Sequence, residues 1–120
     1  MKVRAARGAI VVSEDVPEQV LAASERLVRT MLDRNAIEAE DLVSILFTAT
    51  SDLRSAFPAE AARRMGLGLV PLMCAQEIPV EGSMPSVVRA LMHFNTEREL
   101  ADVSHVYLDG AESLRDDLGR

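Results

Sequence analysis

Aromatic residues, cysteine and long apolar runs are all scarce in this chain of 120 residues. There are three Phe, one Tyr and no Trp, so the core must be built from aliphatic side chains. The single cysteine, Cys74, excludes an intramolecular disulfide and favours a reducing compartment. No stretch approaches the length of a membrane span, and Arg4 and Arg7 interrupt the amino-terminal segment where a signal peptide would be apolar. We therefore expect a cytoplasmic protein without a membrane partner.

Positive charge is also in deficit. The chain has 13 Lys and Arg against 19 Asp and Glu, a formal net charge of -6. An acidic surface repels nucleic acids and anionic membranes, so neither is an expected partner. A small cationic pocket remains compatible with this charge, because near charges in a desolvated site outweigh the distant field. The length fits one domain over residues 1–120.

Several kinds of catalytic machinery are missing from the sequence. The two histidines, His93 and His105, fall in predicted strands and have no acid spaced to orient them beside a nucleophile. No residues show the spacing of metal ligands, and no glycine-rich loop joins a strand to a helix to hold phosphate. We expect no metal and no cofactor. An enzyme built this way would act through electrostatics and confinement of its substrate.

The hydrophobic pattern predicts an α/β (α+β) fold with a mixed five-stranded sheet. The expected strands are 3–12, 42–50, 69–77, 86–94 and 102–108; the expected helices are a long one at about 17–34, a short one at 58–66 and a single turn at 38–41. Asp15 and Glu18 have capping-box spacing before the long helix. The polar tail, about 109–120, is expected to be partly ordered. So little helix cannot cover both faces of the sheet, which favours association.

Arginines interrupt two of the predicted strands. Arg89 lies in the middle of "SVVRALMHF", and Arg7 lies between two alanines on one face of the first strand. A guanidinium in such a place requires a partner, either a carboxylate or a bound anion. Taken singly, a strand arginine is more often an edge residue with its head in solvent, and Arg63 beside Arg64 on the short helix usually belongs to a solvated face. Together, the two strand arginines and Arg63 form a set of three cations. Because the arginine fork gives a carboxylate two parallel hydrogen bonds, these residues predict recognition of a small polyanion.

Three further polar side chains interrupt apolar strands: Cys74, Glu77 and Tyr107. Each also has an ordinary structural interpretation. A lone cysteine is usually a small core residue, a glutamate at a strand end is usually solvated, and a tyrosine can fill the core with its hydroxyl at the rim.

Four stretches together resemble the trimeric α/β-type chorismate mutases. They are "VRAARGAIVVSEDVPEQVLAA", "LFTATSDLRSAFPAEAARRMG", "VPLMCAQEIPV" and "HVYLDGAESLRDDL", and they cover nearly the whole chain in order. The resemblance implies a homotrimer, a pseudo-α/β-barrel of sheets with helices outside, and three sites in clefts between subunits. It also implies the rearrangement of chorismate, a small dianion, to prephenate on the route to phenylalanine and tyrosine.

The resemblance also implies a role for each candidate residue. Arg7 resembles a carboxylate-binding arginine, and Arg89 resembles the central cation beside the ether oxygen of the breaking bond and a substrate carboxylate. Glu77 and Cys74 resemble the pair that contacts the ring hydroxyl, with Glu77, Arg7 and Arg89 as the catalytic residues. The resemblance further implies that Tyr107 contacts a substrate carboxylate and that Arg115 lies near the mouth of the site. The wall contributed by the neighbouring subunit would consist of Phe57, Ala59 and Arg63. The apolar side of the site would be lined by Leu72 and Met73.

The sequence departs from the family pattern at three positions. Glu60 stands where some relatives have lysine, so a second cation at the mouth is lost. Met73 stands where a smaller polar residue can occur, and Asp116 stands where proline often follows the tail arginine. None of these departures falls on the three implied catalytic residues.

Two other functions fit the same anion-binding logic. The imine/enamine deaminases are small trimers of similar architecture with an arginine at the cleft between subunits, and they would require hydrolysis of a nitrogenous substrate. A non-catalytic module that binds an anionic metabolite is the other alternative. The stretches "VPLMCAQE" and "HVYL" favour the mutase over the deaminase.

Overall fold

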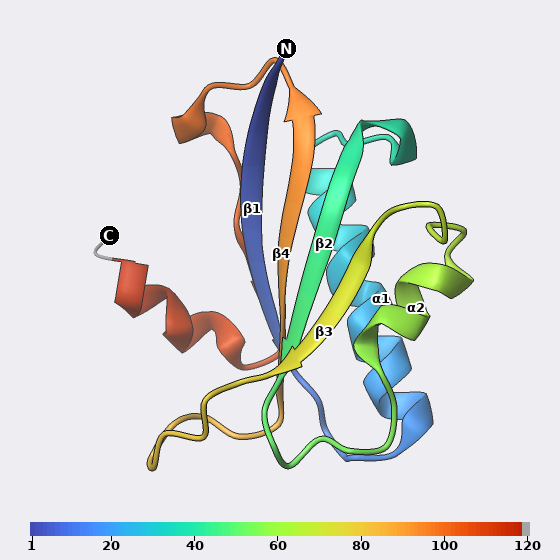
Figure 1. Cartoon of the computed structure of the whole chain (residues 1–120). Helices are drawn as coiled ribbons and strands as arrows, with labels where there is room; N and C mark the ends of the chain where they lie inside the picture. The colour runs from blue at the N-terminus through green and yellow to red at the C-terminus, as the bar shows by residue number, and fades with distance from the viewer. Residues whose placement is uncertain (119–120) are drawn as a thin grey trace.

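Five strands form one mixed sheet in the order β3-β2-β4-β1-β5 (Figure 1). The structure is a computed structural model that describes the backbone of residues 1–118 and the side chains of residues 1–114. The central strand β4 is antiparallel to β1 and β2, whereas β3 runs parallel to β2 and β5 parallel to β1. The bounds are β1 (Lys2–Val11), β2 (Leu42–Ala49), β3 (Leu72–Gln76), β4 (Val87–Thr96) and β5 (Val106–Leu108). The predicted fold class is confirmed.

Two α-helices pack together on one face of this sheet (Figure 1). They are α1 (Pro17–Arg34) and α2 (Pro58–Arg64), each with proline in its first turn, where a missing N–H costs nothing. Three 3-10 segments complete the chain: η1 (Ala39–Asp41), η2 (Leu100–Asp102) and η3 (Ala111–Leu118). Among the residues described, no helix is both long and apolar enough to span a membrane.

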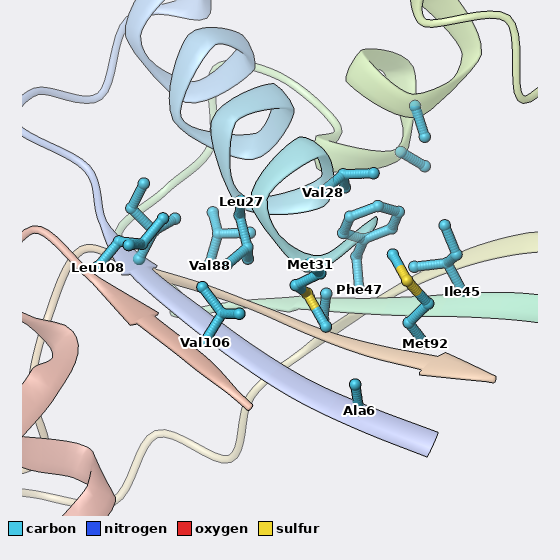
Figure 2. Packing of buried hydrophobic residues seen from close by; sticks show 14 of the residues in the cluster. Ala6, Leu27, Val28, Met31, Ile45, Phe47, Val88, Met92, Val106 and Leu108 are labelled. Carbon is cyan, nitrogen blue, oxygen red and sulfur yellow. The ribbon is translucent and has the colours of Figure 1, made fainter. Parts of the chain in front are cut away.

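The core lies between α1 and the sheet. Leu27, Val28 and Met31 project from α1 onto the strands (Figure 2). Phe47 of β2 lies beneath them in the same cluster, and it is fully buried. Burying one such side chain contributes about 1.5–3 kcal/mol. The stripe of apolar residues predicted for the long helix is therefore the surface that holds it on the sheet.

Gly8 allows β1 and α1 to approach closely. A Cβ atom at this position would lie 2.5 Å from Met31 Sδ and 2.9 Å from Leu27 Cδ1. Both distances are below van der Waals contact in a core packed to the density of a crystal. A side chain at position 8 would therefore displace the buried Met31 and Leu27 side chains, and Arg7 itself points to the other side of the strand.

Two predicted strands start later than expected. The β3 ladder begins at Leu72 because Pro71 has no N–H to donate, although its carbonyl accepts the Ile45 N–H at 3.0 Å. The last strand begins at Val106 because the backbone of Ser104 bonds to the side chain of Asn35 instead of a strand. In the other direction, β4 continues to Thr96, which is paired with Lys2.

The predicted capping role of Asp15 is wrong. Val16 occupies the N-cap of α1, and no side chain caps this end. The carboxylate of Asp15 instead accepts the backbone N–H groups of Arg54 and Ser55 at 3.1 Å, which ties the start of α1 to the loop before α2. Ser55 and the Arg54 N–H hold the pKa of Asp15 below its usual value, because they favour the charged form.

The face of the sheet opposite α1 and α2 is here called the open face. The alternation of β1 places Arg7 and Ala9 on it, as predicted. One end of this face is covered by the start of η3, where Ala111 packs with Ala9 and Tyr107 in a small second cluster. No α-helix among the described residues packs on this face.

Candidate active site

A pocket of about 250 Å³ lies on the open face. Arg7 from β1, Arg89 from β4 and Tyr107 from β5 all line it, so three strands contribute one polar group each. The register explains why they meet: Ala9 is paired with Arg89 on one side and with Tyr107 on the other. The remaining lining is Gly8, Leu46, Thr48, Ala90 and Leu91. The pocket therefore combines two guanidinium groups and a phenol with an apolar floor.

The guanidinium of Arg89 forms an ion pair with Glu77. Its Nε lies 2.6 Å from Glu77 Oε2, and the two side chains are 42% and 19% exposed. Glu77 follows the last residue of β3, and its N–H donates to the carbonyl of Ala49 at 2.9 Å. A carboxylate is thus the partner that Arg89 requires in an otherwise apolar strand, one of the two kinds predicted from the sequence.

Thr48 supports this ion pair. Its hydroxyl donates to the same Glu77 oxygen, Oε2, at 2.7 Å. Thr48 is paired with Arg89 across β2 and β4, and it lines the pocket as well. Sequence reasoning missed this residue. The signal was present, because Thr48 is a polar interruption in the apolar run "LVSILFTAT", two residues after Leu46 on the same face.

His105 contacts the backbone of Arg7. The Arg7 N–H donates to His105 Nδ1 at 3.0 Å, one residue before β5 begins its own pairing with β1. The imidazole thus extends the contact between the two strands beyond the β5 ladder.

Phe57 and Cys74 line a different pocket, of about 650 Å³. The register pairs Cys74 with Phe47, so its side chain points to the helical side of the sheet and packs against the main core. Phe57 precedes α2 and is 70% exposed. The structure does not bring these two residues to Arg7 and Arg89 within one chain.

The other residues implied for the apolar wall divide between the two faces. Ala59 is buried in the main core, and Leu72 packs against that core from the helical side. Met73 is paired with Leu46, so it lies on the open face, where it is 67% exposed. The contacts of these three residues with a ligand remain predictions.

Arg63 forms an ion pair with Glu60, the residue that stands where some relatives have lysine. Its Nη2 lies 3.0 Å from Glu60 Oε1, and Arg64 pairs with the other oxygen of the same carboxylate at 3.3 Å. The hydrogen bond from Arg63, together with Arg64, holds the pKa of Glu60 below its usual value. Arg63 thus remains a surface cation on α2. The side chain of Arg115 lies outside the described residues.

Where side chains are described, no cluster of three or more His, Cys, Asp or Glu residues could hold a metal ion. Ser44 and His93 form another polar pair on the open face, and their Oγ and Nδ1 atoms lie 3.2 Å apart. Ser44 stands four residues before Thr48 on the same strand and face.

Comparisons with known proteins agree with the resemblance seen in the sequence. The family model for chorismate mutase type I matches residues 3–118. The chain is 50% identical to the chorismate mutase AroH of Thermus thermophilus over 117 residues, 97% of this chain and 96% of that protein. It is 36% identical to the chorismate mutase AroH of Bacillus subtilis over 119 residues, 98% of this chain and 94% of that protein.

A solved structure gives the same answer for the fold. The chorismate mutase from Clostridium thermocellum superposes with a TM-score of 0.90 at 44% sequence identity, covering 91% of this chain and 97% of that one. These findings decide against the imine/enamine deaminase alternative. The chain belongs to the chorismate mutase type I family.

Proposed function

We propose that the rearrangement of chorismate to prephenate takes place in the pocket lined by Arg7, Arg89 and Tyr107. Membership of the family makes the chain a chorismate mutase, which is an isomerase. The observation that carries the proposed site is the convergence of two guanidinium groups from different strands on one small pocket with an apolar floor. Chorismate is a dianion with an apolar ring edge, and this lining complements both features.

The reaction needs little chemistry from side chains. One carbon–oxygen bond of chorismate breaks while a carbon–carbon bond forms in the same molecule, without proton transfer or a nucleophile. The protein must hold the enolpyruvyl arm over the ring, which is a proximity effect. It must also stabilise the negative charge that grows on the ether oxygen as the bond opens. A millionfold acceleration requires about 8 kcal/mol in total.

Arg89 is the residue proposed to stabilise the ether oxygen. Its Nε is engaged by Glu77 at 2.6 Å, and the same guanidinium has further N–H donors at its Nη atoms that this contact does not use. A cation fixed before the reaction loses no energy to reorientation as charge develops, so its effect is larger in the transition state than in the ground state.

The carboxylates of chorismate are proposed to bind Arg7 and Tyr107, and its ring hydroxyl is proposed to bind Glu77. Both interactions observed at Glu77 use Oε2, and Oε1 takes part in neither. A ring hydroxyl can therefore donate to Oε1 without displacing Thr48 or Arg89.

The site is proposed to be completed by a neighbouring subunit in a homotrimer. Phe57 and Arg63 lie at α2, in the helical layer, whereas Arg7 and Arg89 lie on the open face. One chain cannot place both groups on one ligand, but a second copy whose α2 region approaches the open face can. The exposed side chains of Phe57 and Met73 supply apolar surface for that contact.

Two measurements test this proposal. Added chorismate should lose its ultraviolet absorbance in the presence of the purified protein, without metal or cofactor, and yield prephenate. Sedimentation equilibrium should give three times the chain mass of 13.1 kDa. A folded trimer that leaves chorismate unchanged would contradict the proposed reaction and direct attention to ligand-dependent stability without turnover. An active monomer would contradict the shared site.

A further inference from the structure

Glu77 and Arg89 are separated by a strand. The sheet order places β2 between β3 and β4, and Glu77 follows β3 whereas Arg89 belongs to β4. The side chain of Glu77 must therefore cross β2 to reach the guanidinium. The residue at the crossing is Thr48, which is paired with Ala75 on one side and with Arg89 on the other.

We infer that Thr48 is a positioning residue for the isomerase reaction, which it serves by holding the Glu77 carboxylate over β2 so that Arg89 is aimed into the pocket. This inference rests on the proposed function of the Arg7 and Arg89 pocket. The evidence is the shared atom: the Thr48 hydroxyl lies 2.7 Å from Glu77 Oε2, and Arg89 Nε lies 2.6 Å from the same oxygen.

Threonine is well suited to this role. Its branched Cβ restricts rotation about χ1, so the hydroxyl is held in one direction on a β-strand. A glutamate has three rotatable bonds, and Glu77 stands at a strand end with part of its side chain exposed. Without the hydroxyl, the carboxylate can turn toward water, and Arg89 then loses the contact that fixes its orientation.

The expected consequence is a change in turnover more than in binding. Orientation of a charge before the reaction matters most where charge develops, which is the transition state. The substrate carboxylates are proposed to be held by Arg7 and Tyr107 in addition to Arg89, and the strands of Arg7 and Tyr107 do not depend on Thr48. We therefore expect Thr48 to affect kcat while KM changes little.

The test uses Thr48→Val, which keeps the shape of the side chain and removes the hydroxyl. We expect kcat for chorismate to fall about tenfold and KM to stay within roughly threefold of the wild-type value. Ser44→Ala is the matched control, because it removes a hydroxyl from the same face of the same strand outside the pocket. It should leave kcat unchanged.

A second pair of variants keeps the test valid if Thr48→Val folds poorly. Thr48→Ser and Thr48→Ala differ from each other only in the hydroxyl, so Thr48→Ser should keep a kcat about tenfold above that of Thr48→Ala. In a Glu77→Ala background, Thr48→Val should cost nothing further, because no carboxylate remains to be held. An equal fall in both backgrounds would show that Thr48 acts through something other than Glu77.

Arg89→Ala separates the two possible failures. If Arg89→Ala loses turnover while Thr48→Val keeps wild-type kcat, this inference is overturned and the proposed site stands. If Arg89→Ala itself keeps wild-type turnover, the proposed site is wrong and Thr48 has no cation to position.

Discussion

Arg89 Nε lies 2.6 Å from Glu77 Oε2, across an intervening strand and on the face of the sheet that no α-helix described in the structure covers. An ion pair this accessible to solvent contributes about 0–1 kcal/mol to stability, so it does not explain why an arginine occupies the middle of an apolar strand. In the proposed mechanism, the ion pair serves to orient the Arg89 guanidinium beside the pocket, which is the property that a charge-stabilised rearrangement requires.

Arg7→Ala should raise KM for chorismate roughly tenfold or more while kcat falls much less, because the proposed carboxylate contact is of a kind made in both the ground and transition states. Arg7→Lys should recover part of the lost affinity, since it restores the charge without the fork. Steady-state kinetics over a range of chorismate concentrations separates the two constants. Loss of kcat with KM unchanged would assign to Arg7 the role proposed for Arg89.

Cys74→Ser should remain active. Cys74 packs against the main core from the helical side of β3 and does not line the Arg7 and Arg89 pocket of its own chain. Serine retains a hydrogen-bonding group of similar size, so we expect kcat near the wild-type value and a slightly lower melting temperature. Complete inactivation of a folded Cys74→Ser protein would indicate covalent chemistry at the sulfur.

Gly8→Ala should destabilise the protein by about 1–3 kcal/mol, the usual cost of adding volume to a packed core. The new Cβ would fall 2.5 Å from Met31 Sδ and force the α1 side chains to move. Gly68→Ala is the matched control, because a Cβ there meets nothing within 4 Å. Urea denaturation of the two variants should give clearly different midpoints; equal midpoints would mean that α1 adjusts without cost.

Asp15 should contribute stability that depends on pH. Because Ser55 and the Arg54 N–H lower its pKa in the folded state, the contribution is present above the unfolded pKa of about 3.9 and is lost as the pH falls through the folded pKa. Asp15→Ala should therefore lower the melting temperature at pH 7, and the difference from wild type should shrink below about pH 4. Glu14→Ala, at the neighbouring position, is the control. A difference that persists undiminished at the lowest pH would contradict this account.

Much of the fold followed from hydrophobic periodicity. The long stripe of α1 and the alternation of β1 were strong signals, and the helix bounds 17–34 and the face of Arg7 were predicted correctly. The late start of β3 reflects the missing N–H of Pro71, whereas the other two errors came from tertiary hydrogen bonds that no local pattern reveals. The Asn35 side chain takes the backbone of Ser104 out of the last strand, and Asp15 bonds to a loop about 40 residues away instead of capping its own helix.

The candidate site was only partly accessible from the sequence. A lone arginine in an apolar strand indicates that a partner exists, but the identity of that partner depends on the order of strands in the sheet. The pairing of Arg89 with Glu77 and the contribution of Thr48 both follow from β2 lying between β3 and β4. The resemblance named Phe57 and Arg63, and the structure places neither of them in the pocket that Arg7 lines.

The most direct test of the central claim is the steady-state kinetics of Arg89→Ala, measured with chorismate beside Arg89→Lys. If Arg89 stabilises charge on the ether oxygen, Arg89→Ala should lower kcat on the order of a hundredfold to a thousandfold, with a much smaller change in KM. Arg89→Lys should lie between it and the wild type, since it keeps the charge but not the contact geometry of the fork. A folded Arg89→Ala protein with wild-type kcat would contradict the claim that this guanidinium drives the reaction.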